Sequence, residues 1–372
     1  MDLSLTESQE MLKSAARELV EREYSKENLV DLDASGNSYR SDLWEKVVSA
    51  GWLGVLIPSD YGGEGRSLTD AAVLFHELGR GPAPGPHFSS AVLGALTIME
   101  AATSEQKHEI LPAVSQGGRV LALAITEAEY GWRPRFIKMA APRRSGGYVL
   151  NGVKLFVQDA LGATHLICAA VLDDGKVGLF LMDTTLPGVT IRPLAGFTTG
   201  AFEIKLDNVE VPPSALLGDG TEDGWQVLER AMMKAIPVLC AYQVGGCERV
   251  FEMTLDYSNT RVQFGVPIGR FQRVQDHIIE MVNQLDAARW TTYEALWKLD
   301  TEQPAASSVH MAKAVTSEAY YQVCNAGHEV HAGVGIMREY GLTLHTKMSR
   351  TLYHYLGDPR YHKRRLAEAL AL

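Results

Sequence analysis

The first third of the chain has hydrophobic residues at helical spacing, three and four positions apart, which places them on one face of a helix. The clearest run is Leu12, Ala15, Ala16 and Leu19. Thr6 followed by Gln9 predicts a capping box at the start of the first helix. We therefore expect an all-α domain over residues 1–118.

Between residues 119 and 218 the pattern changes to short apolar runs separated by Gly, Asp and Pro, as is typical of strands. The runs are Val120–Ile125, Tyr148–Val157, His165–Val171, Val177–Met182, Val189–Pro193 and Phe202–Val211. No long helical pattern lies between them, which argues against a doubly wound parallel sheet. The pattern predicts an antiparallel β-sandwich or barrel in the middle of the chain.

Helical spacing returns in the third domain, residues 222–372. The expected helices are Trp225–Ser258, Gln272–Lys298, Val309–Val330 and Tyr340–Leu370. Pro237 lies inside the first of them and removes one backbone donor, so we expect a kink there without a helix end. The predicted fold class is α+β: an N-terminal helical domain, a middle β domain and a C-terminal bundle of about four helices.

The charge balance excludes several classes of protein. Lys and Arg number 35 against 45 Asp and Glu, so the formal net charge is −10. The chain therefore lacks the excess of basic residues on which nucleic-acid binding depends. Apolar runs are far below the roughly 18 residues that a membrane-spanning helix needs. The first thirty residues mix acid and base and lack the pattern of a secretory signal. We expect a soluble, cytoplasmic protein.

The cysteines and histidines predict neither disulfides nor a metal site. Cys240 and Cys247 lie on one expected helix, roughly 10 Å apart along its axis, beyond the ~7 Å limit for a disulfide. Cys168 and Cys324 complete the four cysteines, without a CxxC motif, and a reducing cytoplasm fits them. The HEVH phrase at 328–331 is not HExxH and has no evident third ligand, so we expect ordinary polar positions there.

Five phrases, in order along the chain, resemble the acyl-CoA dehydrogenase family. The most specific is RVQFGVPIGRFQ at 261–272, which is similar to the family's RxQFGxPIxxFQ. The others are LGVLIPSDYGG at 53–63, GGYVLNGVKLF at 146–156, DNVEVP at 207–212 and HAGVG at 331–335. The resemblance covers essentially the whole chain, and it implies FAD as the cofactor and α,β-dehydrogenation of an acyl-CoA thioester as the activity.

The resemblance also implies which residues meet FAD. In the family the 261–272 phrase holds the adenosine pyrophosphate of a neighbouring subunit's FAD, and a guanidinium fork suits phosphate oxygens. The residues so implied are Arg261, Gln263, Phe264, Ile268, Phe271 and Gln272. The family's QxxGGxG phrase adds Glu329 and Gly333, with Glu in place of Gln and Ala332 in place of a Gly. Because a carboxylate repels a diphosphate, Glu329 is expected to meet a ribose hydroxyl or Arg261.

The part of the sequence that meets the flavin ring in the family departs further from the family pattern. The TEPxxGSD loop reads TEAEYGW at Thr126–Trp132, with bulky Tyr130 where small residues approach the ring. The aromatic–Ile–Thr/Ser phrase reads FVQ at Phe156–Gln158. The sequence leaves open whether this pocket still holds FAD.

Both positions at which the family carries its catalytic carboxylate are apolar here. The YEGT phrase reads YLGD, with Leu356 in place of Glu, and the position 26 residues before Arg261 is Ala235. Neither side chain can act as a general base. Asp358 and Glu229 are possible substitutes, although a helix cap before Pro359 and a solvated helix face are their more usual roles.

The 261–272 phrase matches the family's pyrophosphate-binding motif, yet the chain has no catalytic base at either family position. This combination suggests a heteromer. The chain then resembles acyl-CoA dehydrogenases of α2β2 type, similar to bacterial enzymes that shorten steroid side chains, in which a homologous partner supplies the base and the acyl pocket. The alternatives are a self-sufficient flavoenzyme using Asp358 or Glu229 and a flavin-free structural paralogue. The basic phrase HKRR at 362–365 is expected to suit the dipole of a final helical turn, with phosphate contact as the alternative.

Overall fold

The computed structural model describes residues 4–35, 41–144, 146–197 and 200–372. The chain divides into two compact units, each of which draws on separate stretches of sequence. Unit 1 comprises Met1–Asn37, Ser67–Ala83 and Ile236–Leu372, and unit 2 comprises Ser38–Arg66 and Pro84–Ala235. The three sequence domains at 1–118, 119–218 and 222–372 remain a prediction.

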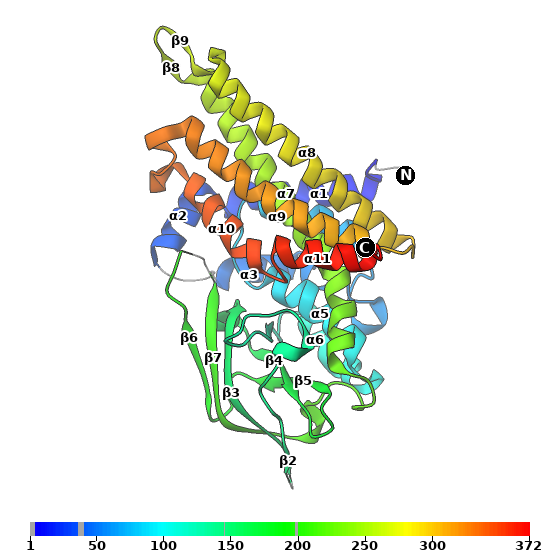
Figure 1. The fold of residues 1–372 in the computed structure, drawn as a ribbon. Helices are drawn as coiled ribbons and strands as arrows, with labels where there is room; N and C mark the ends of the chain where they lie inside the picture. Colours follow the sequence, from blue (N-terminus) through cyan, green and yellow to red (C-terminus); the bar gives the residue numbers. More distant parts are fainter. Residues whose placement is uncertain (1–3, 36–40, 145, 198–199) are drawn as a thin grey trace. The chain divides into compact units, whose positions relative to one another are not determined.

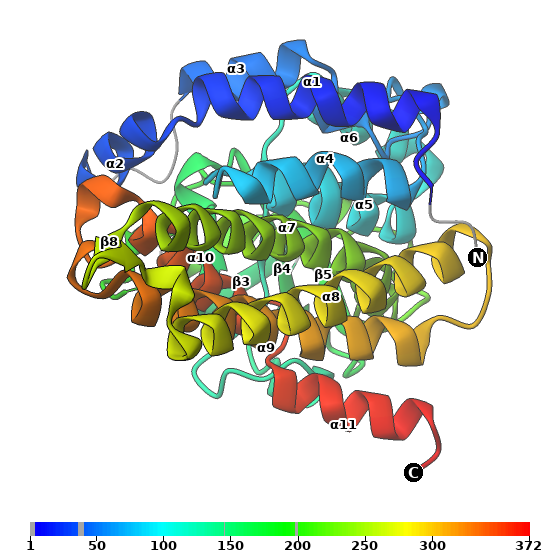
Figure 2. The same ribbon diagram turned by 90° about the horizontal axis from the view of Figure 1, so that it is seen from above.

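Unit 1 is helical. It contains α1 (Glu7–Glu23), α2 (Lys26–Ser35), α4 (Leu68–Arg80), the second part of α7 (Gly224–Thr260), α8 (Gln272–Asp300), α9 (Ala306–His331), α10 (Leu342–His354) and α11 (Pro359–Ala369). The predicted capping box is confirmed, because the Thr6 hydroxyl accepts from the Gln9 N–H while the Gln9 amide accepts from the Thr6 N–H. Figure 2 shows α1 beside α4 and α8 beside α9, and both pairs are in contact.

The core of unit 1 lies where α7, α8 and α9 meet. Its buried side chains include Val244, Cys247, Val250, Met281, Leu285, Ala288, Tyr320, Val323 and Cys324. Two glycines let α4 and α7 approach closely: a Cβ on Gly79 would lie 1.9 Å from the Tyr242 carbonyl oxygen, and one on Gly245 would lie 1.9 Å from that of His76. Only glycine fits at both positions, so polar side chains on these two helices can meet directly.

The final helix was predicted as one piece, Tyr340–Leu370, and this was wrong. The chain instead forms α10 and α11, so α7 to α11 make five helices in the described C-terminal residues. Leu356 and Gly357 both have left-handed backbones, with φ of 60° and 104°, and Pro359 has no N–H to continue a helix. Asp358 restarts the helix as its N-cap, accepting from the Tyr361 N–H at 2.7 Å.

Unit 2 begins with helices and continues as a β-sandwich. Its helices are α3 (Ser41–Ser49), the π-helical turn η3 (Ser89–Gly94), α5 (Ala95–Ala101), α6 (Ser104–Ser115) and the first part of α7. Pro237 stands inside α7, which continues to Thr260, so the prediction of no helix end at this proline is confirmed.

Two sheets form the sandwich, with strand orders β1–β4–β5 and β2–β3–β7–β6. The strands are β1 (Leu121–Ala124), β2 (Arg143–Arg144), β3 (Gly147–Gln158), β4 (His165–Val171), β5 (Val177–Asp183), β6 (Val189–Pro193) and β7 (Ala201–Val211). Side chains from both sheets share one core, for example Leu150 and Ile204 from one and Phe180 and Cys168 from the other. The six predicted strands are confirmed, and β2 was not predicted.

One strand pair differs from the antiparallel prediction. β1 runs parallel to β4, with Leu121 opposite His165, whereas the other pairs of the two sheets are antiparallel. After β1 the chain enters the second sheet as β2 and β3 before it returns as β4. Such a crossover permits parallel pairing, which a short hairpin does not.

The four cysteines are buried and unbridged. In the described part of the chain, no helix combines the length and the apolar character needed to cross a membrane.

Candidate functional site

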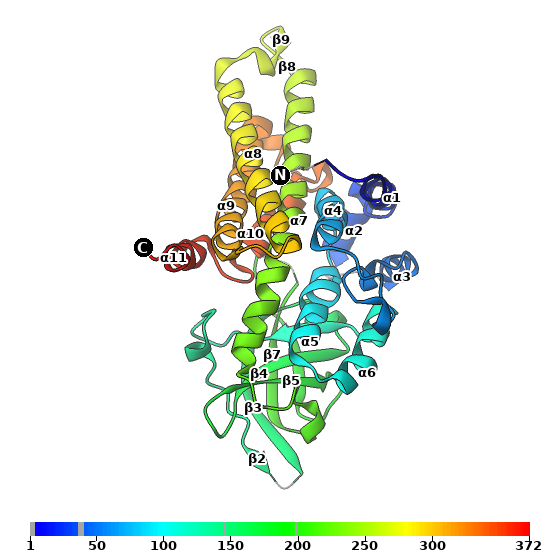
Figure 3. The ribbon, with the colours of Figure 1, turned by 90° about the vertical axis from the view of Figure 1, so that its right-hand side faces the viewer.

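The 261–272 phrase forms an exposed hairpin in unit 1. Strands β8 (Val262–Gln263) and β9 (Val266–Pro267) pair between the ends of α7 and α8, as Figures 1 and 3 show. Phe264 and Gly265 form the two-residue turn with φ of 54° and 82°, and positive φ at both positions is typical of a tight type I′ hairpin. The Phe264 ring is 93% exposed and meets Phe271 edge-on at 6.0 Å.

Arg261 stands where α7 ends and the hairpin begins. Its backbone is fixed, because its N–H donates to the Tyr257 carbonyl and its carbonyl accepts from the Ile268 N–H. Its guanidinium is exposed and has no partner among the described residues. The Gln263 amide donates to the Val262 carbonyl at 2.8 Å, and Gln272 is exposed at the start of α8. An exposed aromatic ring in the turn and a free cation at the base of the same hairpin fit a phosphate-bearing cofactor such as FAD.

The second implied phrase lies beside the first. The ring of His331, in the last turn of α9, stacks on Tyr257 of α7 with centroids 4.5 Å apart, one turn before Arg261. Glu329 and Gly333 therefore belong to the same end of unit 1 as the hairpin. Glu329 is exposed and forms no ion pair with Arg261 in the described structure.

Ala332 keeps a backbone conformation that suits glycine. Its φ of 49° and ψ of −131° resemble the first central residue of a type II′ turn, where glycine dominates. Alanine thus stands here, in place of the first glycine of the family's QxxGGxG phrase, in a conformation that glycine adopts without strain.

The two histidines near this phrase form hydrogen bonds within unit 1. His331 bonds the Gly327 carbonyl at 2.7 Å and the Tyr340 hydroxyl at 2.9 Å, and His328 bonds the Thr346 hydroxyl at 2.7 Å. Burial lowers the pKa of both imidazoles. Across the described residues, no group of three metal-binding side chains occurs.

The two base positions are buried as well as apolar. Ala235 is 0% exposed on α7, and Leu356 is 2% exposed in the turn before α11. The Leu356 carbonyl accepts from the His362 ring at 2.9 Å. Of the possible substitutes, Asp358 caps α11 with its carboxylate, and Glu229 is half-buried on the first part of α7.

The loop over Thr126–Trp132 in unit 2 is tied to strand β3. The Glu127 carboxylate accepts from the backbone N–H groups of Lys138 and Met139 at 3.1 Å and pairs with the fully buried Lys154 ammonium at 2.7 Å. The Thr126 hydroxyl donates to the Leu155 carbonyl. This hydroxyl is therefore engaged within the chain, which weakens the fit to a flavin ring.

A bulge in β3 turns an aromatic side chain outward. The pairing of β3 with β7 shifts between Lys154 and Val157, and Phe156 has φ of 56° with its ring 46% exposed. Bulges of this kind re-aim side chains beside active sites. Tyr130, also left-handed, packs edge-on against Phe156 at 5.0 Å, and the buried indole N–H of Trp132 has no partner among the described residues. This part of unit 2 therefore still presents aromatic side chains, and its loop contains an indole N–H without a hydrogen-bond partner among the described residues.

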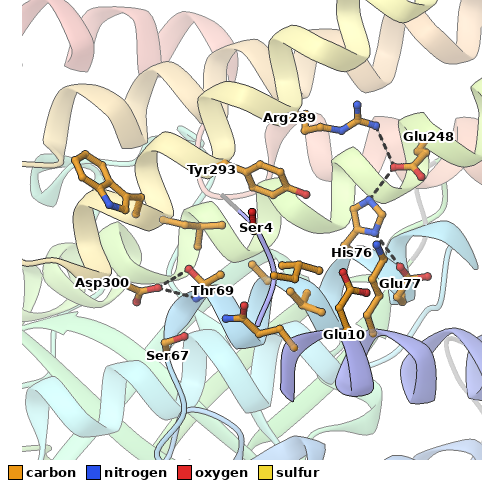
Figure 4. A pocket seen from close by; sticks show the side chains of 17 residues that line it. Ser4, Glu10, Ser67, Thr69, His76, Glu77, Glu248, Arg289, Tyr293 and Asp300 are labelled. Carbon is orange, nitrogen blue, oxygen red and sulfur yellow. Dashed lines mark hydrogen bonds and ion pairs between the residues drawn. The ribbon is translucent and has the colours of Figure 1, made fainter. Parts of the chain in front are cut away.

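Sequence reasoning missed one site, a cleft of about 610 Å³ between α1, α4, α7 and α8 of unit 1, drawn in Figure 4. Here His76 bonds Glu77 at 3.2 Å and Glu248 at 3.1 Å, and Glu248 also pairs with Arg289 at 3.2 Å. Burial alone would lower the pKa of His76, but these two carboxylates raise it.

No local sequence signal marks this cleft. His76 and Glu248 are 172 positions apart and meet because Gly79 and Gly245, three residues away on α4 and α7, allow close approach of the two helices. Burial opposes ionisation of Glu248, but the hydrogen bond from His76 and nearby cations lower the pKa of this carboxyl to about 2. The cleft wall therefore carries fixed charges.

Three protein-family models match the chain in succession. They are described as the N-terminal, middle and C-terminal domains of acyl-CoA dehydrogenase and match residues 6–118, 122–209 and 222–371.

Comparisons with individual proteins agree. The chain is 29% identical over 355 residues to the probable acyl-CoA dehydrogenase YngJ of Bacillus subtilis (strain 168), covering 92% of each. It superposes on the ChsE4-ChsE5 complex from Mycobacterium tuberculosis with a TM-score of 0.90 and 26% identity, over 100% of this chain and 99% of that one. PigA, solved with FAD and proline, gives a TM-score of 0.89 at 26% identity over all of both chains.

Proposed function

This chain belongs to the acyl-CoA dehydrogenase family of flavoenzymes, and we propose that it acts there as a subunit without a base of its own. In this proposal it completes the FAD site of a homologous partner within an α2β2 heterotetramer. The complex performs α,β-dehydrogenation of an acyl-CoA bound mainly by the partner.

The observation that carries the proposal is the exposed hairpin that begins at Arg261 and turns at Phe264. Phe264 is 93% exposed, and the Arg261 guanidinium has no partner among the described residues. Val262 and Phe271 of the same phrase are also exposed, so the hairpin presents a group of apolar side chains, which is typical of a surface that another molecule covers. The Arg261 guanidinium, where the same hairpin begins, supplies the planar N–H pairs that phosphate oxygens accept. Both features suit the diphosphate of a cofactor held by another subunit.

The two apolar base positions support the proposal that the partner subunit supplies the catalytic base. The cofactor accepts hydride in this family, and a protein carboxylate must remove the proton. Ala235 and Leu356 have no group that can do so. The Asp358 carboxylate is already engaged by the Tyr361 N–H. We infer that the proton is taken by a carboxylate of the partner.

Two further parts of the proposal rest on resemblance. The likeness to the ChsE4-ChsE5 complex, at 26% identity, supports a heteromeric assembly. The resemblance to enzymes that shorten steroid side chains supports a bulky acyl-CoA as substrate. Four buried, unbridged cysteines are compatible with the cytoplasm as location.

The proposal is tested by Arg261→Ala in the co-expressed complex. A charge-assisted hydrogen bond to a diphosphate contributes roughly 1.5–3 kcal/mol, so the dissociation constant of FAD should rise by on the order of 10- to 150-fold. Bound flavin and the activity regained on adding FAD are measured. Arg273→Ala is the matched control, because this arginine of α8 is 79% exposed on its side chain and lies outside the phrase.

The control should leave flavin content unchanged. If Arg261→Ala also retains its flavin with the same dissociation constant, the hairpin does not hold the cofactor. The flavin-free structural paralogue then becomes the better account of this chain.

A further inference from the structure

The cleft beside His76 is lined by three polar side chains that have no polar partner. Glu10 and Lys13 of α1 and Tyr293 of α8 line it, and none of the three side chains forms an ion pair or a hydrogen bond among the described residues. Opposite charges three residues apart on a helix can pair, yet Glu10 and Lys13 do not. Each of the three side chains is therefore available to a bound molecule.

Other charged groups of the cleft wall are already engaged. The Glu77 carboxylate accepts from the Arg17 guanidinium at 3.0 Å, in addition to its bond with His76. The Asp300 carboxylate accepts from the backbone N–H of Thr69 at 3.0 Å, in the first turn of α4. Because these acids have partners within the protein, the charged groups of a ligand would meet the unpartnered side chains instead.

The cleft also offers a hydrogen-bond donor and an apolar wall. In Figure 4 the Tyr293 hydroxyl points into the cleft, toward the side on which His76 lies. Burial raises the pKa of Tyr293, so its hydroxyl keeps the proton and can donate. The volume of about 610 Å³ lies within the range of roughly 300–1,000 Å³ that is typical of small-molecule sites. Its apolar lining comes from Leu5, Val73, Leu296 and Trp297.

We propose that this cleft binds a small zwitterion with an apolar side group, which is the chemistry of an apolar amino acid. Glu10 accepts from the ammonium of the ligand, while Lys13 and the Tyr293 hydroxyl donate to its carboxylate. The apolar side group packs against the apolar wall. A simple carboxylate would meet repulsion from Glu10, and a simple amine would meet repulsion from Lys13, so a ligand that carries both charges is favoured.

The site goes beyond the proposed function, since it shares no residue with the Arg261 hairpin. Calorimetric titration of the full chain with L-phenylalanine therefore tests it without any flavin or partner. Wild type should bind L-phenylalanine saturably. Hydrocinnamate, which lacks the ammonium, and phenethylamine, which lacks the carboxylate, should each bind more weakly by on the order of tenfold or more, because each loses a charge-assisted hydrogen bond.

Two variants should each remove one of these preferences. Glu10→Gln should bind L-phenylalanine no better than hydrocinnamate, and Lys13→Gln should bind it no better than phenethylamine. Glu7→Gln is the matched control for the carboxylate, because Glu7 is exposed in the same first turn of α1 but does not line the cleft. This control should bind all three compounds as wild type does.

Lys363→Gln is the matched control for the lysine, because Lys363 is exposed on α11 and does not line the cleft. It belongs to the basic phrase at 362–365, which was predicted to lie in a final helical turn. This was wrong, since the phrase lies in the middle of α11. Lys363→Gln should also bind as wild type does.

Thermal unfolding gives a second readout. L-Phenylalanine should raise the melting temperature of wild type and of both controls. Tyr293→Phe, which removes only the hydroxyl, should lose part of that rise. No saturable binding of L-phenylalanine by wild type, equal affinity for all three compounds, tighter binding of hydrocinnamate than of L-phenylalanine, or undiminished affinity in both Glu10→Gln and Lys13→Gln would each overturn the proposal.

Discussion

At the scale of single residues, Ala332 makes the clearest prediction. Its φ of 49° and ψ of −131° are costly for any side chain, typically 1–3 kcal/mol, and glycine removes that cost. Glycine also adds chain entropy to the unfolded state, which offsets part of the gain. Ala332→Gly should therefore raise the free energy of unfolding by about 1 kcal/mol in urea denaturation.

The control for this substitution is Ala287→Gly at an exposed position inside α8. It should lower the free energy of unfolding by about 1 kcal/mol, because glycine is a poor helix former. A loss of stability from Ala332→Gly as well would show that the backbone there is not strained.

His76 predicts a dependence of stability on pH. Burial disfavours the charged ring, but the hydrogen bonds that His76 donates to Glu248 and Glu77 outweigh it and raise the pKa of His76 above the ordinary value of about 6.5. The stability that this pairing contributes is then fully present below about pH 6.5 and is lost as the pH rises through the raised pKa. Glu248, whose pKa is lowered to about 2, stays ionised throughout this range.

The comparison of wild type with His76→Gln isolates this contribution, because other titrating groups are common to both. At pH 5.5–6.5 the variant should be less stable by about 2–3 kcal/mol in urea denaturation. The stability difference between the two proteins should shrink as the pH rises through the raised pKa of His76. A difference that stays constant from pH 5.5 to 9 would contradict the charged state assigned to His76.

At the scale of elements, the sequence predicts regular structure well where the pattern is local. The β-sandwich strands and the long helices α7, α8 and α9 follow from apolar spacing within each segment. The break before α11 was missed because Leu356 adopts a left-handed backbone that its residue type does not favour. The parallel pair β1–β4 was missed because strand direction depends on the route of the chain between the strands, not on the strands themselves.

Substitutions of Asp358, at the start of α11, distinguish a helix-capping role of its carboxylate from a catalytic one. As an N-cap it should contribute about 1 kcal/mol, so Asp358→Ala should lower the free energy of unfolding by that amount. Asp358→Asn should preserve stability, because asparagine caps equally well, while it removes any basic function. If Asp358→Asn keeps full stability but abolishes turnover, Asp358 is a catalytic base and the chain is self-sufficient.

At the scale of the whole molecule, the candidate site was predictable only in part. The hairpin residues are contiguous in sequence, so one phrase predicted them together, and the Tyr257–His331 stack places the second phrase beside them. The His76 cleft joins helices that are far apart in the sequence and that no motif connects. Long-range sites of this kind depend on packing, which spacing along the chain does not report.

The isolated chain should not turn over acyl-CoA. Both base positions are apolar, and no pH supplies Ala235 or Leu356 with a proton acceptor. The purified chain, reconstituted with FAD, is assayed with short, medium and bulky acyl-CoA thioesters and an artificial electron acceptor. Turnover by the isolated chain that Glu229→Gln or Asp358→Asn abolishes would identify the substitute base and refute the proposed division of labour.

The most direct test of the account is the flavin content of the purified heteromeric complex. If the Arg261 hairpin serves the partner's FAD while the unit 2 pocket at Thr126–Trp132 holds none, the complex should carry about one flavin per heterodimer. Flavin released by denaturation is quantified by absorbance against the protein concentration. Two flavins per heterodimer would contradict the account, because both subunits would then have a complete cofactor site.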